Sequence, residues 1–109
     1  KYADAEADQR ERWEDELTAA IEAEYRRQRA EYAAGLQAWL RDVWLGTLGA
    51  TEQLNFLPAL RDASAAVAAR LQPAEARTNL ETWERTQRLL HTNAQEALVL
   101  EVGLLQLRL

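Results

Sequence analysis

Residue types that commonly carry out chemistry are few in this chain, and their spacing matches no catalytic arrangement. There is one histidine, His91, no cysteine, and one serine, Ser64, which stands among alanines. Protein zinc sites draw on several His or Cys side chains, so His91 is predicted to be a polar residue at a helix end, not a ligand or general base. The residue types therefore predict no catalytic residue, no metal site and no cofactor.

Pairs of carboxylates are the other candidates for acid–base chemistry. They occur at Glu14-Asp15-Glu16 and at Glu22 and Glu24. Hydrolases use such pairs inside an apolar cleft, whereas these fall on the polar side of a long predicted helix, which favours a solvated surface. A small helical enzyme is one interpretation of these acids. It requires a pocket in which two carboxylates meet and at least one of them has a raised pKa.

Charge argues against nucleic acid as a direct partner. The net charge is −5, and an acidic chain has no general attraction for phosphates. The basic cluster Arg26-Arg27-Arg29 has glutamates around it, which favours ion pairs at the surface over a phosphate site. None of the four glycines belongs to a phosphate-binding loop.

The elements that position these residues are predicted to be helices. Ala and Leu dominate, Gly and Pro are scarce, and no alternation is long enough for a strand. A length of 109 residues fits one domain. The prediction is an all-α bundle of about five helices, with a long N-terminal helix and a largely buried C-terminal helix.

Local signals divide the chain. Residues 1–35 are predicted to form a long charged amphipathic helix that leads into a helical domain of residues 36–109. Gly35 is a possible bend, and Gly46 and Gly49 mark the end of the next segment. A linker with a short helical turn is expected over Thr51–Leu57. Later helices are expected to begin near Pro58, near Pro73, and after Asn93 as N-cap, with Glu96 completing a capping box.

The last helix is the most apolar part of the chain. From Asn93 to Leu109 the only charged residues after Glu96 are Glu101 and Arg108. A helix that is apolar nearly all round needs cover, and about 15 residues give roughly 22 Å, too short for a bilayer of about 30 Å. The sequence thus predicts a central core helix and no membrane contact, with Gly103 at a close contact between helices.

Two sets of apolar residues follow from these patterns. Trp13, Leu17 and Tyr25 recur on one face of the first helix, which is longer than the rest of the domain can cover, so its N-terminal part is expected to project. Trp83 is flanked by charged residues and is either a core residue or an interface anchor. The candidate partner-interface residues are Trp13, Leu17, Tyr25 and Trp83. The predicted core residues are Leu36, Trp39, Leu40, Val43, Leu60, Val67, Leu71, Leu80, Leu98, Val102 and Leu105.

Three stretches between Leu36 and Leu109 resemble a known family. They are Leu36-Gln-Ala-Trp-Leu-Arg-Asp-Val-Trp44, the block around Ala69-Arg-Leu-Gln-Pro73, and the closing run Asn93-Ala-Gln-Glu-Ala-Leu-Val-Leu-Glu-Val-Gly-Leu-Leu-Gln-Leu107. In order and spacing they are similar to the C-terminal collar domain of the delta prime subunit of bacterial DNA polymerase III, a clamp loader component. The gamma/tau collar domain is similar as well. Val102-Gly103 departs from the family, which tends to have larger aliphatics there.

The resemblance implies a role in subunit association during DNA replication. In that family, helical collar domains of five subunits form a ring that holds the ATPase modules together. The implied partners are other clamp loader subunits, with no small-molecule substrate expected for a subunit-association domain; the implied location is cytoplasmic, and this part of the parent has no catalytic residue. The absence of Met, with Lys1 at the start, leads us to expect a piece of a longer protein. The alternative is an unrelated helical adaptor or coiled-coil module that associates through the first helix.

Overall fold

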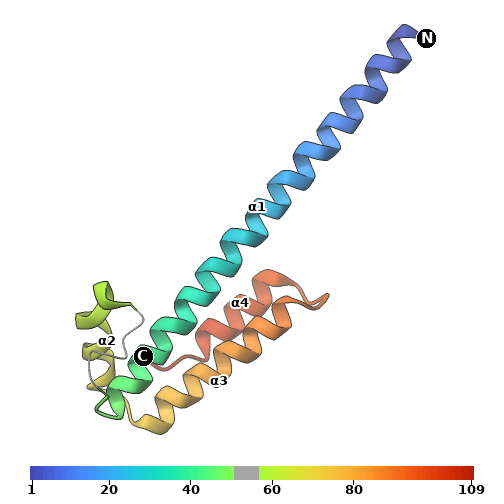
Figure 1. Cartoon of the computed structure of the whole chain (residues 1–109). Coiled ribbons are helices and arrows are strands. Elements are labelled where there is room, and N and C mark those ends of the chain that lie inside the picture. The colour runs from blue at the N-terminus through green and yellow to red at the C-terminus, as the bar shows by residue number, and fades with distance from the viewer. Residues whose placement is uncertain (51–56) are drawn as a thin grey trace. The chain divides into compact units, whose positions relative to one another are not determined.

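The structure, a computed structural model, describes residues 1–50 and 57–109. Its elements are α1 (Tyr2–Thr47), the 3₁₀ turn η2 (Pro58–Leu60), α2 (Arg61–Ala68), α3 (Pro73–Leu90) and α4 (Glu96–Leu105) (Figure 1). Every regular element in these two ranges is helical, which confirms the all-α class. The same ranges hold four α-helices where five were expected. The predicted linker turn lies largely outside the described residues, because residues 51–56 are not among them.

The chain divides into two compact units, Lys1–Tyr32 (unit 1) and Ala33–Leu109 (unit 2). Unit 1 consists of the first part of α1, and the second part of α1 belongs to unit 2. The bend expected at Gly35 is wrong, since α1 continues as a helix to Thr47. One glycine costs a helix only about 1 kcal/mol relative to alanine, which good helix formers on both sides can offset.

Glycine ends α1 as the sequence predicts. Gly49 has a φ of 75°, a conformation that favours glycine. The amide of Gly49 donates to the carbonyl of Gly46 at 3.1 Å, and the amide of Ala50 donates to the carbonyl of Leu45 at 2.9 Å. These two bonds form a Schellman motif, which satisfies carbonyls that the end of the helix leaves without partners.

The starts of the last two helices differ in how well the sequence predicts them. Pro73 is the first residue of α3, as expected, and the Gln72 amide before it donates to Glu75 Oε1 at 3.0 Å. The N-cap of α4 is Gln95, two residues after the predicted Asn93. The reason is local: the hydroxyl of Thr92 accepts the amide of Ala94 at 3.2 Å, so the turn after α3 includes Asn93.

The hydrophobic core of unit 2 lies where α1, α2 and α3 meet. Val43, Val67 and Ala76 are buried, and Trp39, Trp44, Ala68 and Leu71 pack against them. Leu40 is also buried, while Leu36 and Leu80 are half-buried. The prediction is therefore confirmed for Leu40, Val43 and Val67, and Trp39 and Leu71 contribute from the edge of the core. Leu60 is 45% exposed in η2, so its assignment to the core is wrong.

The prediction of a largely buried C-terminal helix is also wrong. Gly103 is the only buried residue of α4. Three of its predicted core residues are exposed, Leu98 by 56%, Val102 by 47% and Leu105 by 77%, and Leu104 is 50% exposed. The physical reason is that α4 packs mainly on α3, through the side that carries Gly103, which leaves Leu98, Val102 and Leu105 on its outer side.

Small and polar side chains form the contact between α3 and α4. A Cβ placed on Gly103 would lie 2.3 Å from Thr86 Oγ1, so the two helices approach closely there, as the sequence predicts. The hydroxyl of Thr86 donates to the carbonyl of Thr82 at 2.8 Å. Asn79, Thr82 and Thr86, one helical turn apart on α3, are all buried. The side of α3 toward α4 is therefore polar, but its hydrogen bonds are satisfied.

The segment after α4 is fastened to α3. The side-chain amide of Asn79 donates to the carbonyl of Arg108 at 2.8 Å, and its oxygen accepts the amide of Arg108 at 2.9 Å. The guanidinium of Arg70 donates to the carbonyl of Leu109 at 2.6 Å. Both backbone groups of Arg108 are thereby paired, and the orientation of α4 is fixed at both Gly103 and the tail.

Candidate interaction surface

The outer side of α4 presents an apolar surface to solvent. Leu98, Val102 and Leu105 follow one another at four and three residues and so lie on one face of the helix, which we call the α4 face. Gly103 lies on the side toward α3. Contiguous exposed apolar residues are typical of protein–protein contacts. The structure brings together here three residues that the sequence analysis assigned to the core.

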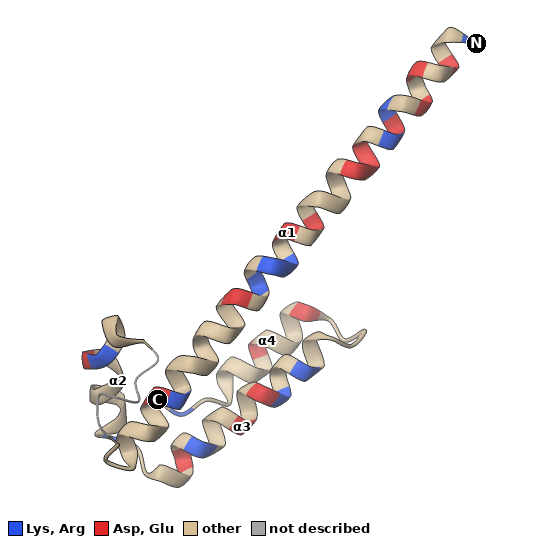
Figure 2. Cartoon of the chain, in the orientation of Figure 1, with Lys and Arg blue, Asp and Glu red and all other residues tan. Residues whose placement is uncertain are grey.

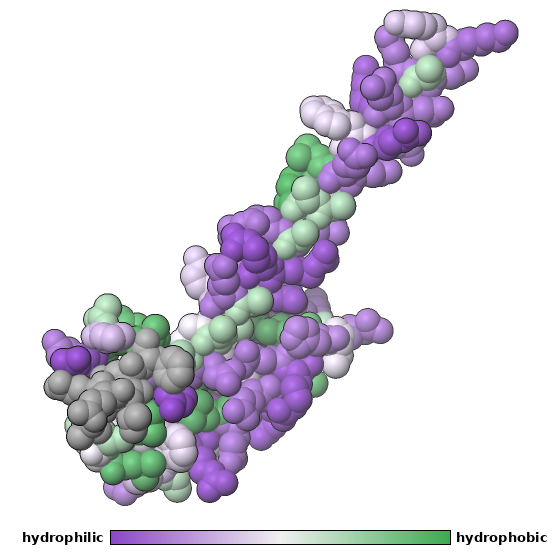
Figure 3. Space-filling model, viewed as in Figure 1, coloured by the Kyte–Doolittle hydropathy of each residue, from purple (hydrophilic) through white to green (hydrophobic). Residues whose placement is uncertain are grey.

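Unit 1 carries a second apolar surface along its single helix. Trp13, Leu17, Ile21 and Tyr25 recur every four residues and are 67%, 52%, 61% and 54% exposed; we call them the α1 stripe. Figure 3 shows hydrophobic atoms interrupting the hydrophilic surface in the middle of this unit. Three of the four predicted interface residues, Trp13, Leu17 and Tyr25, are therefore accessible to a partner.

Trp83, the fourth predicted interface residue, is part of the interior. It is 3% exposed, and its indole N–H donates to the carbonyl of Ala33 at 2.9 Å across the contact between α3 and α1. Beside it, the Gln87 amide donates to Gln37 Oε1 at 2.7 Å. The interface assignment is wrong because the charged neighbours of Trp83 in the sequence point away from the face that carries the ring.

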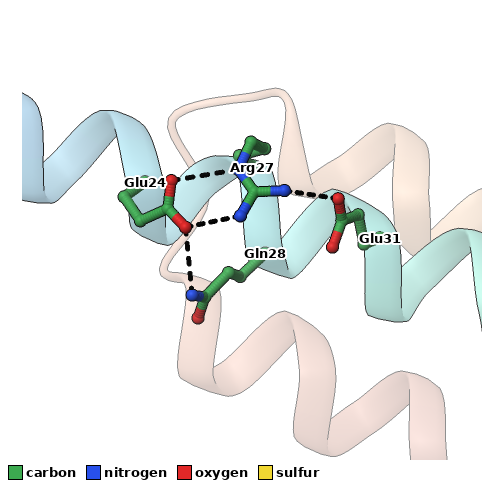
Figure 4. A network of polar contacts seen from close by, with 4 residues as sticks. All are labelled: Glu24, Arg27, Gln28 and Glu31. Carbon is green, nitrogen blue, oxygen red and sulfur yellow. Dashed lines mark hydrogen bonds and ion pairs between the residues drawn. The ribbon is translucent and has the colours of Figure 1, made fainter.

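Charged groups on unit 1 pair along the helix. Arg27 donates to Glu24 Oε1 and to Glu31 Oε1, each at 2.5 Å, and Gln28 also donates to Glu24, at 3.1 Å (Figure 4). These bonds hold the pKa of Glu24 below its ordinary value, with Arg27 as the main cause and Gln28 as the second. The same contact with Glu24, with help from Glu31, raises the pKa of Arg27. This agrees with surface ion pairing at Arg27, one of the three arginines of the basic cluster.

Acids and bases are distributed unevenly in unit 1. Figure 2 shows mainly acidic residues toward the N-terminus, with a basic group farther along α1. Between residues 3 and 16 there are seven acids and two arginines, and between residues 22 and 34 there are three acids and three arginines. The first stretch is thus strongly negative, whereas the second is neutral.

Unit 2 has a groove between α1 and α3 of about 430 Å³. It is lined by Ala34, Gln37, Ala38, Arg41, Trp44, Leu80 and Glu84. Outside the undescribed residues 51–56, no group of three or more His, Cys, Asp or Glu side chains is placed to hold a metal ion. The hydroxyl of Ser64 is turned to its own helix, since it donates to the carbonyl of Arg61 at 3.0 Å.

His91 lies at the C-cap of α3, where its amide donates to the carbonyl of Arg88 at 3.2 Å, and it is exposed. This agrees with the predicted polar residue at a helix end. In the parts of the chain that the structure describes, no helix combines the length and the apolar character needed to cross a bilayer.

No family model matches the chain, and neither a curated protein nor a solved structure is significantly similar to it.

Sequence reasoning missed the α4 face, although a signal for it exists. A buried helix normally meets apolar partners, but the residues one turn apart on α3 are Asn79, Thr82 and Thr86. Thr86 lies opposite Gly103 and Asn79 bonds to Arg108, so this side of α3 offers α4 a close contact without an apolar surface. Together with the apolar spacing of Leu98, Val102 and Leu105, these contacts point to an outward face on α4.

Proposed function

We propose that the chain is a subunit-association module whose α4 face docks on another protein. The observation that carries the proposal is the exposure of Leu98, Val102 and Leu105 on one side of a helix whose other side is fixed against α3. A rigid helix with an outward apolar stripe fits the groove or helix of a partner and needs little reordering on binding.

The partner class we propose is the other subunits of a clamp loader, with this chain as a delta prime-like collar domain that acts in DNA replication in the cytoplasm. The resemblance runs from Leu36 to Leu109, a range that falls inside unit 2. The most apolar of the three resembling stretches includes α4. A ring of helical domains requires contact surfaces between subunits, and the α4 face offers one. In this role the chain holds subunits together and performs no catalysis itself.

The test is sedimentation velocity of the chain mixed with the other clamp loader subunits, with three variants. Leu105→Glu and Leu98→Glu each place a charge on the α4 face, where burial without a partner is costly, and we expect each to weaken association at least 10-fold. Leu60→Glu is the matched control, because Leu60 is an exposed leucine (45%) in η2, an element outside both α3 and α4, and we expect it to associate as the wild type does.

Two results would refute the proposal in different ways. If the wild type associates with none of these subunits at concentrations on the order of 10 µM, well above the Kd typical of stable subunit contacts, the clamp loader assignment is wrong. If the wild type associates and Leu105→Glu associates equally well, the α4 face is not the docking surface.

A second candidate function, favoured by the exposure of the α1 stripe, is a helical adaptor or coiled-coil module unrelated to clamp loaders. It places the contact on Trp13, Leu17, Ile21 and Tyr25 instead of α4. The two functions are separable, because the adaptor retains its partner when Leu98 or Leu105 is changed and loses it when the α1 stripe is changed.

A further inference from the structure

We propose that unit 1 pairs with unit 1 of a second copy of this chain, antiparallel, about a two-fold axis midway between Leu17 and Ile21. The residues of the α1 stripe are, in order, aromatic, aliphatic, aliphatic and aromatic at equal spacings of four. Such an order reads alike in both directions along the helix. The proposed pairing depends on unit 1 alone and is independent of the role proposed for α4.

A symmetric dimer requires a surface that is complementary to itself. The proposed axis exchanges Leu17 with Ile21 and Trp13 with Tyr25, so each aliphatic side chain meets an aliphatic one and each ring meets a ring. Residues four apart form one of the ridges by which helices pack. All four side chains are more than half exposed and so available to this contact.

Charge selects the antiparallel direction. A parallel pair would place the two strongly acidic stretches, residues 3–16, side by side, with seven acids in each. An antiparallel pair places each acidic stretch beside residues 22–34 of the other copy, which contain Arg26, Arg27 and Arg29 and carry no net charge. Like charges at close range destabilise a helix pair, so the antiparallel direction is favoured.

The available area indicates a weak dimer. Four aromatic rings, two from each copy, offer roughly 600–1,000 Å² when fully covered, and four aliphatic side chains add to this. Specific protein pairs bury about 1,200–2,000 Å². The contact lies at the low end of this range, and we expect half of the chains to be paired at a concentration of about 10–100 µM.

Cysteine cross-linking of the full chain tests the direction and the register, because the chain has no cysteine of its own. Facing Cα atoms of packed helices are roughly 4–6 Å apart, which a disulfide can span. We expect a mixture of Leu17→Cys and ¹⁵N-labelled Ile21→Cys chains to form mixed disulfides at least 5-fold over either homodimer, by intact mass. Ala19→Cys is the control, because residue 19 lies on the opposite side of the helix, and it should form few disulfides.

Three outcomes of the cross-linking would overturn the proposal. A Leu17→Cys homodimer as the main product indicates parallel pairing. Equal cross-linking of Ala19→Cys places the contact on another face. No mixed disulfide above the level of Ala19→Cys, at chain concentrations of about 100 µM, means that unit 1 does not pair in this register.

Sedimentation equilibrium supplies a readout that involves no thiol. We expect the wild type to show a dimer that Ile21→Glu weakens at least 10-fold and Ala19→Glu leaves unchanged, with helix content by circular dichroism equal in both variants. A wild type that remains monomeric at about 100 µM overturns the proposal. Because Ile21→Glu leaves α4 intact, failure here is distinguishable from failure of the docking role proposed for the α4 face.

Discussion

Replacing Gly103 by alanine is expected to lower the free energy of unfolding of unit 2 by about 2 kcal/mol, although alanine is the better helix former. The new Cβ would lie 2.3 Å from Thr86 Oγ1 and 2.6 Å from Thr86 Cγ2, closer than any ordinary contact. Thr86 is 4% exposed and its hydroxyl is bonded to the carbonyl of Thr82, so it has little room to move. Urea unfolding followed by circular dichroism measures the loss.

Gly35→Ala is the matched control for this change. Gly35 is also inside a helix, but a Cβ there meets nothing within 4 Å, so we expect the free energy of unfolding to rise by about 0.5–1 kcal/mol. Adding Thr86→Ala to Gly103→Ala should restore part of the lost stability, because it removes the two nearest atoms. A Gly103→Ala variant as stable as the wild type would contradict the close approach of α3 and α4.

Replacing Trp83 by alanine is expected to lower the free energy of unfolding by about 3–5 kcal/mol, a larger loss than that expected for Gly103→Ala. The indole is 3% exposed and joins α3 to α1 through its bond to the carbonyl of Ala33. Trp83→Phe keeps most of the packing but loses the hydrogen bond, so we expect a smaller loss of about 1–2 kcal/mol. Thermal and urea unfolding of both variants measure these values.

A small effect of Trp83→Ala on stability would contradict the burial of this side chain. If Trp83→Ala changes the free energy of unfolding by less than about 0.5 kcal/mol, as is usual for exposed sites, the side chain does not belong to the core. Weaker association with a partner in such a stable variant would make it the interface anchor that the sequence alone allows.

Local rules explain the parts of the fold that the sequence predicts well. The glycine turn that ends α1, Pro73 at the start of α3, and the buried positions Leu40, Val43 and Val67 each depend on residues within a few positions or on one helical face. The same rules fail at Gly35, because one glycine weakens a helix without ending it. They also fail at Asn93, because the Thr92 hydroxyl provides a competing turn.

The position of α4 depends on information that composition does not contain. An apolar helix indicates that cover is needed, but the cover can come from the same chain or from a partner. The decisive residues are on α3, where Asn79, Thr82 and Thr86 form a polar surface that accepts one side of α4 at Gly103. The same ambiguity affects Trp83, whose charged neighbours in sequence lie on other sides of its helix.

Buried polar groups are likewise beyond sequence reasoning. Asp42 is 2% exposed and accepts the amide of Leu57 at 3.0 Å, and Asn79 pairs with both backbone groups of Arg108. Each bond joins residues at least fifteen apart. Short-range patterns in the sequence do not reveal such pairs, yet these hydrogen bonds fix the ends of the segments that unit 2 brings together.

Thiol labelling tests directly whether the α4 face is open in the lone chain and covered in a complex. The chain has no cysteine, so Leu105→Cys and the reference Leu60→Cys each carry a single thiol. We expect a maleimide to label both rapidly in the lone chain, and the proposed clamp loader partners to slow labelling at residue 105 at least 10-fold while leaving residue 60 unchanged. A thiol at residue 105 that is unreactive in the lone chain, or equally reactive with and without these subunits, would contradict the claim.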